Sequence, residues 1–307
     1  MSIHRQKGCS FMKNTIFTGA GVALVTPFAA DGSVDYTTFA ALIEEQIAAG
    51  TDALIIAGTT GESATLTEEE HVEVLRFAVQ QTNHRVPVIA GTGSNDTSFC
   101  VSLSQEAESL GADALLLVTP YYNKASQKGL YIHYKTIAES VHIPVILYNV
   151  PSRTGVNIDV ETVAKLAEIP NIVAIKEASG SISYLAKLMA RCGDIIDVYS
   201  GNDDQIVPMM ALGAKGVISV LSNVAPKETH EMAMAALNGD YSTAAKLQLE
   251  YIPLISALFS EVNPIPVKEA LNMMGKQVGE CRLPLCAMEE KNREVLRAAL
   301  QEKGLLA

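Results

Sequence analysis

The segment NIVAIKEASG, residues 171–180, contains an apolar run that ends in a charged side chain. Residues 172–175 are all apolar, and Lys176 follows them at once. A continuous apolar run of this length is typical of a parallel β-strand covered on both faces, whereas a strand with one exposed face alternates between apolar and polar residues. The segment therefore predicts a buried parallel strand with an ammonium group at its carboxyl end.

Seven similar runs accompany this one, and segments with helical patterns separate them. The runs recur at intervals of about 20–35 residues, the length of a β-α unit. Eight such units predict an α/β fold, a closed (β/α)8 TIM barrel. The alternative, a doubly wound sheet, normally has fewer strands and a phosphate-binding fingerprint, and neither GxGxxG nor GxxxxGKS/T occurs here. The runs are GVALVTPF from Gly21, DALIIAG from Asp52, PVIAGTG from Pro87, DALLLVTP from Asp113, PVILYNVP from Pro144, IVAIKEA from Ile172, IDVYSGND from Ile196 and GVISVLSN from Gly216.

The segments between the runs carry helix signals. Residues 36–50 place apolar side chains on one helical face and end in Gly50, which suits a helix C-cap. Thr67 and Glu70 have the spacing of a capping box at the start of another helix. After Asn223 the strand pattern stops, and alanine-rich helical stretches continue to the end of the sequence. The sequence therefore predicts helices around the barrel and a C-terminal helical appendage.

These patterns divide the chain into three parts. We predict a polar N-terminal extension at residues 1–14, the barrel at residues 15–238 and a C-terminal helical domain at residues 239–307, packed against the barrel. Residues 15–30 are apolar enough to imitate a secretory signal, but internal glycines and Pro27 favour a first buried strand. No apolar run is long enough to span a membrane.

The overall composition argues against several classes of protein. The 307 residues carry a formal net charge of −11, and no cluster of Lys and Arg offers the phosphate contacts of a nucleic-acid binder. The five cysteines form no CxxC pair, so we expect reduced thiols and a cytoplasmic location. The six histidines form no metal-binding motif. The sequence predicts no metal site and no cofactor, and neither nucleic acid nor membrane as a partner.

Active sites of barrels of this type lie at the carboxyl ends of the strands, so the residues just after each run are candidates. Lys176 is the first of them, because burial disfavours an ammonium group and a neutral lysine forms Schiff bases with ketones. The alternative is a lysine that extends to solvent or pairs with Glu177 or a neighbouring carboxylate. The polar residues expected to converge at this end are Thr59, Thr60, Tyr122, Tyr148, Arg153 and Lys176.

Schiff-base chemistry needs groups that move protons and groups that hold the substrate. Tyr148 and Tyr122 are candidate acid/base groups, with Thr59 as a relay between them, although each tyrosine could instead simply cap a strand. The GTTGE turn at residues 58–62, which includes Gly61, has backbone N–H groups that suit a carboxylate, as well as the glycines of any tight turn. Arg153 offers a planar fork for a second carboxylate, or is a surface arginine. Together these residues predict a metal-free class I aldolase or condensing enzyme for a keto acid.

Several of these motifs, in this order, resemble the dihydrodipicolinate synthase family. The resemblance covers residues 17–306, nearly the whole chain, and the set is far more specific than any single motif. It implies a (β/α)8 barrel with a C-terminal helical domain, usually a tetramer of two tight dimers. The motifs are GTTGE at Gly58, TPYYN at Thr119, YNVPSRTG at Tyr148, IKEASG at Ile175, NPIPVK at Asn263 and RLPL at Arg282.

The resemblance also implies an activity, the condensation of pyruvate with L-aspartate 4-semialdehyde in the diaminopimelate route to lysine. By resemblance, Lys176 carries the pyruvate Schiff base, and the backbone carbonyl of Ile218 lies near it. Thr60, in the turn with Gly61, helps hold the pyruvate carboxylate, and Arg153 binds the carboxylate of the aldehyde. The implied proton relay consists of Tyr148, Thr59 and Tyr122, the last reaching in from a neighbouring subunit.

Two other functions are weighed against this one. N-acetylneuraminate lyases and sugar-acid aldolases share the lysine and the tyrosine, but Arg153 and the second threonine of GTTGE, Thr60, fit the synthases better. A barrel that serves only as a binding or structural protein would be expected to have lost Lys176, Tyr148 or Arg153, and all three are present.

Feedback by lysine is a separate prediction. His71, Asn95 and Tyr121 match positions of the allosteric lysine site in sensitive family members. Glu68, however, stands where a histidine is common, and Phe99 stands where a glutamate contacts the lysine amine. Loss of that carboxylate should cost about 1–3 kcal/mol of binding free energy. We therefore predict weak inhibition by lysine or none.

Overall fold

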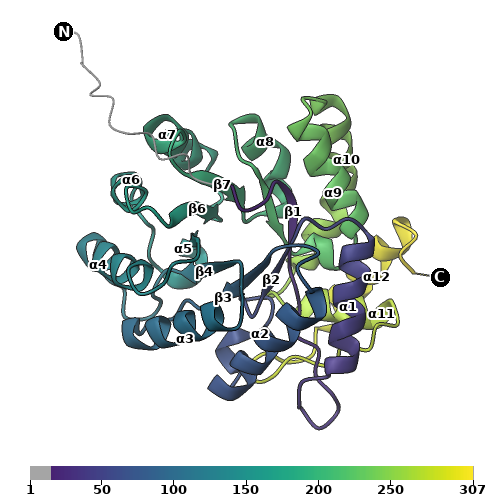
Figure 1. The fold of residues 1–307 in the computed structure, drawn as a ribbon. Coiled ribbons are helices and arrows are strands. Elements are labelled where there is room, and N and C mark those ends of the chain that lie inside the picture. Colours follow the sequence, from purple (N-terminus) through teal and green to yellow (C-terminus); the bar gives the residue numbers. More distant parts are fainter. Residues whose placement is uncertain (1–14, 307) are drawn as a thin grey trace.

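The computed structural model describes residues 15–306, and the predicted extension at residues 1–14 lies outside the described part. Eight parallel strands close into a barrel in chain order, β1 next to β8, with helices around the outside (Figure 1). The prediction of a (β/α)8 barrel is confirmed. The strands are β1 (Gly19–Ala23), β2 (Ala53–Ile56), β3 (Val88–Gly91), β4 (Ala114–Val118), β5 (Val145–Asn149), β6 (Ile172–Glu177), β7 (Asp197–Ser200) and β8 (Gly216–Ser219).

Each strand leads into one or more helices, and several of these helices begin with a side-chain cap. The Thr67 hydroxyl accepts from the Glu70 N–H while the Glu70 carboxylate accepts from the Thr67 N–H, so the predicted capping box is confirmed. The helices are α1 (Tyr36–Ala48), α2 (Glu68–Thr82), α3 (Thr97–Ser109), α4 (Gln127–Ala138), α5 (Pro151–Thr154), α6 (Val160–Leu166), α7 (Ile182–Cys192), α8 (Ile206–Ala211), α9 (Pro226–Leu237), α10 (Tyr241–Leu258), α11 (Ile265–Met273) and α12 (Glu290–Glu302), with short 3-10 turns at η1 (Ser63–Thr65), η2 (Asp203–Gln205) and η3 (Leu221–Asn223).

Two apolar clusters account for the continuous apolar strands. A large cluster fills the layer between the strands and the surrounding helices, and a smaller one fills the interior of the barrel. In the smaller cluster the rings of Phe17 and Tyr199 stack at a centroid distance of 4.3 Å. Because both faces of every strand are covered, a polar side chain on the inner face must find its partners at an end of the barrel.

The C-terminal helices α10, α11 and α12 follow a short turn at residues 238–240. In Figure 1 the helices α11 and α12 lie on the side of the barrel that carries α1, and the region after α10 contacts the first β-α units. Three ion pairs tie these regions together: Lys268 with Glu62, Lys276 with Glu45 and Arg282 with Glu70. Residues 239–306 contain no strand, although a domain boundary at residue 239 stays a prediction.

No helix between residues 15 and 306 combines the length and the apolar character needed to cross a membrane.

Candidate active site

A cavity of about 190 Å³ opens at the carboxyl ends of the strands. Five of the residues predicted from the sequence line it together: Thr59, Thr60, Tyr148, Arg153 and Lys176. They come from the turn after β2, from the end of β5 and the helix after it, and from β6. The remaining lining residues are Ala23, Ile55, Gly58, Leu116, Val150, Ser152, Ala178, Gly201, Asn202, Val220, Phe259 and Asn263.

Lys176 lies on β6 directly between Tyr148 of β5 and Tyr199 of β7. Its side chain is buried, with 6% of the residue exposed, and its Nζ lies 4.5 Å from the centroid of the Tyr148 ring. Gly201 leaves the space that the lysine occupies, because a Cβ there would come within 3.1 Å of the Lys176 Cε. The alternative of a lysine that extends to solvent is therefore wrong.

The other alternative, a pair between Lys176 and Glu177, is also not what the structure contains. The Glu177 carboxylate accepts from the Asn149 Nδ2 at 2.7 Å and from the Ser179 N–H at 2.6 Å. Consecutive residues of a strand point to opposite faces, so the Glu177 side chain is directed away from the barrel interior that Lys176 enters.

Burial lowers the pKa of the Lys176 ammonium to about 8, with the charge of Asp203 opposing the shift and that of Arg153 adding to it. At pH 7 a lysine with this pKa is neutral in about one molecule in ten, against about one in 3000 for an ordinary lysine. A buried, partly neutral amine is the form that attacks a carbonyl carbon.

Tyr148 is a predicted site residue whose ring lies directly under this amine. Burial raises the pKa of its hydroxyl, while the Arg153 charge and a hydrogen bond with the Thr59 side chain act in the opposite direction. The hydroxyl therefore holds its proton at neutral pH and can donate it. This gives the site a proton donor beside a nucleophile.

The turn after β2 presents Thr59 and Thr60 to the cavity. The Glu62 N–H donates to the Thr59 carbonyl at 3.1 Å, and the Thr26 hydroxyl donates to the Gly61 carbonyl at 2.7 Å. Thr60 is buried, and its Oγ1 accepts from the Asn263 Nδ2 at 2.9 Å. The turn is therefore held by contacts on several sides.

Arg153 lies on α5, a short helix that begins at Pro151 and is followed by Gly155 in the left-handed region. Its Nη2 donates to the Asn263 backbone carbonyl at 3.1 Å. Arg153 lines the active-site cavity and also a larger cavity beside it. A guanidinium group with remaining donors in such a place can bind a carboxylate.

Three residues predicted for the site do not line this cavity in the described part of the chain: Tyr122, Gly61 and Ile218. The Tyr122 side chain is 92% exposed, and its φ of +71° is uncommon for a tyrosine. Gly61 is buried in the turn behind Thr60, and Ile218 is buried on β8 beside Gly21. One chain alone thus brings together five of the eight predicted catalytic and substrate-binding residues.

The larger cavity beside the active site has a volume of about 470 Å³ and contains most of the predicted allosteric residues. His71, Tyr121, Glu68 and Phe99 line it, and the Asn95 Nδ2 donates to the Tyr121 carbonyl at 3.2 Å. The His71 Nε2 lies 2.8 Å from the Gly91 carbonyl oxygen, and burial lowers the pKa of the imidazole. His71 is therefore neutral at neutral pH.

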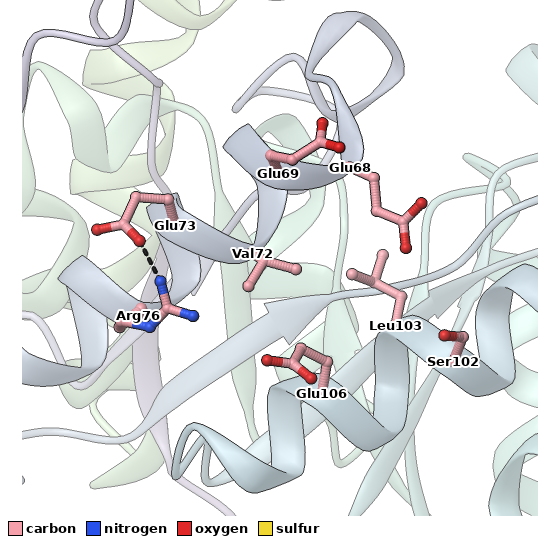
Figure 2. Close-up of a pocket in the computed structure, with 8 residues that line it drawn as sticks. All are labelled: Glu68, Glu69, Val72, Glu73, Arg76, Ser102, Leu103 and Glu106. Atoms are coloured by element: carbon pink, nitrogen blue, oxygen red, sulfur yellow. Dashed lines mark hydrogen bonds and ion pairs between the residues drawn. The ribbon is translucent and has the colours of Figure 1, made fainter.

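A third hollow, of about 520 Å³, lies between α2 and α3 (Figure 2). Its polar lining is mainly acidic, with Glu68, Glu69, Glu73 and Glu106 around Arg76, which pairs with Glu73. Within residues 15–306 no group of three or more His, Cys, Asp or Glu side chains is arranged to hold a metal ion.

Sequence reasoning missed Asn263, which contacts both Thr60 and Arg153. The proline-rich segment VNPIPV, residues 262–267, predicts a connector between helices. That is correct only for residues 262–264, because α10 ends at Leu258 and α11 begins at Ile265. The NPIPVK motif at Asn263 contributes to the resemblance, but it gave Asn263 no role in the site. Only the fold brings it next to a turn that lies 203 positions away in the sequence.

A parallel barrel with a buried, partly neutral lysine and a tyrosine at the carboxyl ends of its strands defines a class of enzyme, the lyases of the class I aldolase type. Within that class, the chain belongs to the dihydrodipicolinate synthetase family, whose model matches residues 16–303.

Individual relatives agree with this assignment. The 4-hydroxy-tetrahydrodipicolinate synthase of Acetivibrio thermocellus is 56% identical over 295 residues, which are 96% of this chain and 100% of the relative. The dihydrodipicolinate synthase of Acinetobacter baumannii, solved in complex with pyruvate, superposes with a TM-score of 0.93 at 47% identity, covering 95% of this chain and 100% of that one. A monomeric dihydrodipicolinate synthase variant superposes with a TM-score of 0.92 at 44% identity, covering 95% and 98% of the two chains.

Proposed function

We propose that this chain condenses pyruvate with L-aspartate 4-semialdehyde, as a 4-hydroxy-tetrahydrodipicolinate synthase of the diaminopimelate route to lysine. The observation that carries the proposal is the buried Lys176, with its lowered pKa, beside Tyr148. Pyruvate bound to the similar Acinetobacter baumannii enzyme supports it.

The reaction begins with attack of the neutral Lys176 amine on the ketone carbon of pyruvate. The carbinolamine that forms loses water, with the Tyr148 hydroxyl as proton donor, and becomes an imine. Loss of a proton from the methyl group then gives an enamine, whose carbon attacks the aldehyde of the second substrate. The proposed relay between these steps consists of Tyr148, Thr59 and the Tyr122 of a neighbouring subunit.

The carboxylates of the two substrates are assigned to two places in the site. The turn that contains Thr60 and Gly61 holds the pyruvate carboxylate, and Arg153 binds the carboxylate of the semialdehyde. The backbone carbonyl of Ile218, on β8, is assigned by resemblance a place near Lys176 in the pyruvate site. The 190 Å³ cavity is small, which suits three- and four-carbon substrates.

The test is pyruvate consumption with L-aspartate 4-semialdehyde at neutral pH, with N-acetylneuraminate cleavage measured alongside. We expect condensation and no sialate cleavage. Absence of condensation while pyruvate is still trapped on Lys176 by borohydride would leave the imine chemistry intact and move the chain to the sugar-acid aldolases.

Replacement of Arg153 by alanine is expected to raise the KM for the semialdehyde by about 10- to 100-fold, because a charge-assisted bidentate contact contributes about 1.5–3 kcal/mol. Borohydride trapping of the pyruvate imine should change by less than about threefold, since Arg153 is assigned to the other substrate. Steady-state kinetics with the semialdehyde concentration varied give the KM, and borohydride trapping with pyruvate alone gives the amount of imine. Loss of imine formation would contradict the assignment.

Lysine is expected to inhibit weakly or not at all. Phe99 and Glu68 line the cavity that contains His71 and Tyr121, so an aromatic ring stands where a carboxylate would pair with the lysine ammonium. Initial rates measured across a range of lysine concentrations give the inhibition constant. Inhibition at sub-millimolar lysine would refute the prediction, and Phe99→Glu, which restores the carboxylate, is the matched variant in which inhibition should appear.

The proposed assembly is a homotetramer of two tight dimers in the cytoplasm. An exposed Tyr122 with a strained backbone is the kind of residue that a neighbouring subunit would accommodate. Cys100, Cys281 and Cys286 carry free thiols, which suits a reducing compartment. The similar monomeric variant makes the oligomeric state a point to measure by analytical ultracentrifugation.

A further inference from the structure

The NPIPVK segment, residues 263–268, touches the turn after β2 at two points. The Asn263 Nδ2 donates to the Thr60 Oγ1 at 2.9 Å, and the Lys268 Nζ donates to the Glu62 Oε1 at 2.9 Å. Both partners on the turn lie within residues 58–62, the GTTGE motif. One short stretch of the C-terminal region therefore holds the turn that carries Thr59 and Thr60.

The second of these contacts is a buried ion pair. The side chains of Lys268 and Glu62 are each only 2% exposed. The Lys268 Nζ also donates to the Glu280 carbonyl at 2.8 Å and lies 4.2 Å from the centroid of the Phe28 ring. The Glu62 Oε2 accepts from the Arg282 N–H at 2.9 Å. Both charges are thus hydrogen-bonded as well as paired.

A buried ion pair is a poor device for stability alone, because removing two charges from water costs about as much free energy as their attraction returns. It does fix the geometry of the residues around it, because the two buried charges compensate each other only when their side chains are in contact. Glu62 has a φ of +55°, in the left-handed region that a non-glycine residue adopts only when its surroundings hold it there. The contacts of its carboxylate with Lys268 and with Arg282 supply that hold.

Charge gives the pair a second effect. Glu62 lies two residues after Thr60, on the turn assigned to the pyruvate carboxylate. An unpaired carboxylate buried there would repel an anionic substrate, and little solvent would screen the repulsion. Lys268 compensates that charge from the side of α11.

We propose that Lys268 and Glu62 are positioning residues for pyruvate: they fix the turn at residues 58–62 so that it receives the carboxylate, without touching the substrate themselves. This inference rests on the proposed function, because it assigns the turn to the pyruvate carboxylate. It adds a role for α11, which lies outside the eight β-α units.

The experiment uses the double variant Glu62→Gln/Lys268→Met in the full chain, which removes both charges at nearly constant volume. The measured quantity is the pyruvate concentration that gives half-maximal borohydride trapping on Lys176. We expect this concentration to rise at least about fivefold, because small misplacements of binding groups are costly, with a maximal trapping rate within about threefold of the parent. The KM for the semialdehyde should stay within about twofold.

The control is His230→Asn, which disrupts a part-buried pair with Asp52 at the opposite end of the barrel, where the Asp52 carboxylate also accepts from the Ala20 N–H at the start of β1. It should lower the Tm without changing pyruvate saturation. Lys268→Arg, which keeps the charge, should restore most of the pyruvate affinity lost in Lys268→Met.

Three outcomes overturn the inference: pyruvate saturation in the double variant within about twofold of the parent, an equal effect of His230→Asn, or a change confined to Tm. If the double variant does not fold, the single variant Glu62→Gln is used, because it keeps an acceptor for Lys268 and removes the acceptor of the Arg282 N–H. Unchanged pyruvate saturation in that variant overturns the inference. A parent protein that traps no pyruvate at all refutes the proposed function instead, so the two failures are distinguishable.

Discussion

Lys176→Met is expected to lower the condensation rate by about 10⁴-fold or more, the size of loss seen when a covalent nucleophile is removed. Methionine fills the same buried space on β6 but has no amine, so no imine with pyruvate can form. The measurements are the steady-state rate and the mass of the protein after borohydride reduction with pyruvate. A mass increase that persists in the variant would place the nucleophile elsewhere.

Two comparisons separate chemistry from folding in this experiment. The matched control is Lys187→Met, an exposed lysine on α7, which should keep its activity. The folded-state pKa of Lys176, about 8, lies below its ordinary value of 10.5, so its ammonium form opposes folding below pH 8 by about 3 kcal/mol and no longer does so above pH 10.5. The Tm of Lys176→Met at pH 7 should therefore equal or exceed that of the parent.

The pH dependence of trapping in the parent protein checks the same assignment. Only the neutral amine attacks pyruvate, so the trapping rate should rise between pH 6 and pH 8 and level off above the pKa of about 8. A rate that keeps rising to pH 10 would mean that Lys176 titrates as an ordinary lysine.

Tyr148→Phe is expected to lower the condensation rate by about 10²- to 10⁴-fold, the range for a general acid-base group. The phenyl ring keeps the contact with the Lys176 ammonium, whose Nζ lies 4.5 Å from the ring centroid, so the loss is confined to the hydroxyl proton. Single-turnover imine formation and the overall rate, measured together, show which step slows.

The control for this variant is Tyr134→Phe. Tyr134 is a fully buried tyrosine on α4, outside the cavity, and its hydroxyl meets the Thr119 Oγ1 at 3.3 Å. Tyr134→Phe should lower the free energy of unfolding by about 1 kcal/mol, the contribution of one buried hydrogen bond, and leave the condensation rate unchanged. If Tyr148→Phe retained the parent rate within about threefold, the assignment of Tyr148 as proton donor would be wrong.

The barrel could be predicted from the sequence because its signal is local and repeated. Each continuous apolar run is a strand with both faces covered, and each unit restates the pattern, so an error in one unit leaves the others intact. The capping box of α2 is similarly local, since Thr67 and Glu70 need only their spacing. The boundary between the barrel and the C-terminal helical domain has no comparable sequence signal, because α9 and α10 share the same alanine-rich pattern.

The site residues that could be predicted from the sequence are those at the carboxyl ends of strands. Tyr148 and Lys176 end neighbouring strands, and their register in the barrel places them side by side. Asn263 and Lys268 were not found as site residues, because their partners lie more than 200 positions away and no spacing rule connects them. Tyr122 differs again: a single chain leaves it exposed, and its proposed role needs a second subunit.

The distance in sequence between the turn and its two supports affects how a newly made chain becomes active. During synthesis the eight strands, complete at Ser219, leave the ribosome before Asn263 and Lys268 do. Contacts between distant positions are the slow ones to form, and domains made first fold first. We therefore expect a nascent chain to have a barrel and a buried lysine before the turn at residues 58–62 can hold a keto acid firmly, so that activity appears only once α11 has docked.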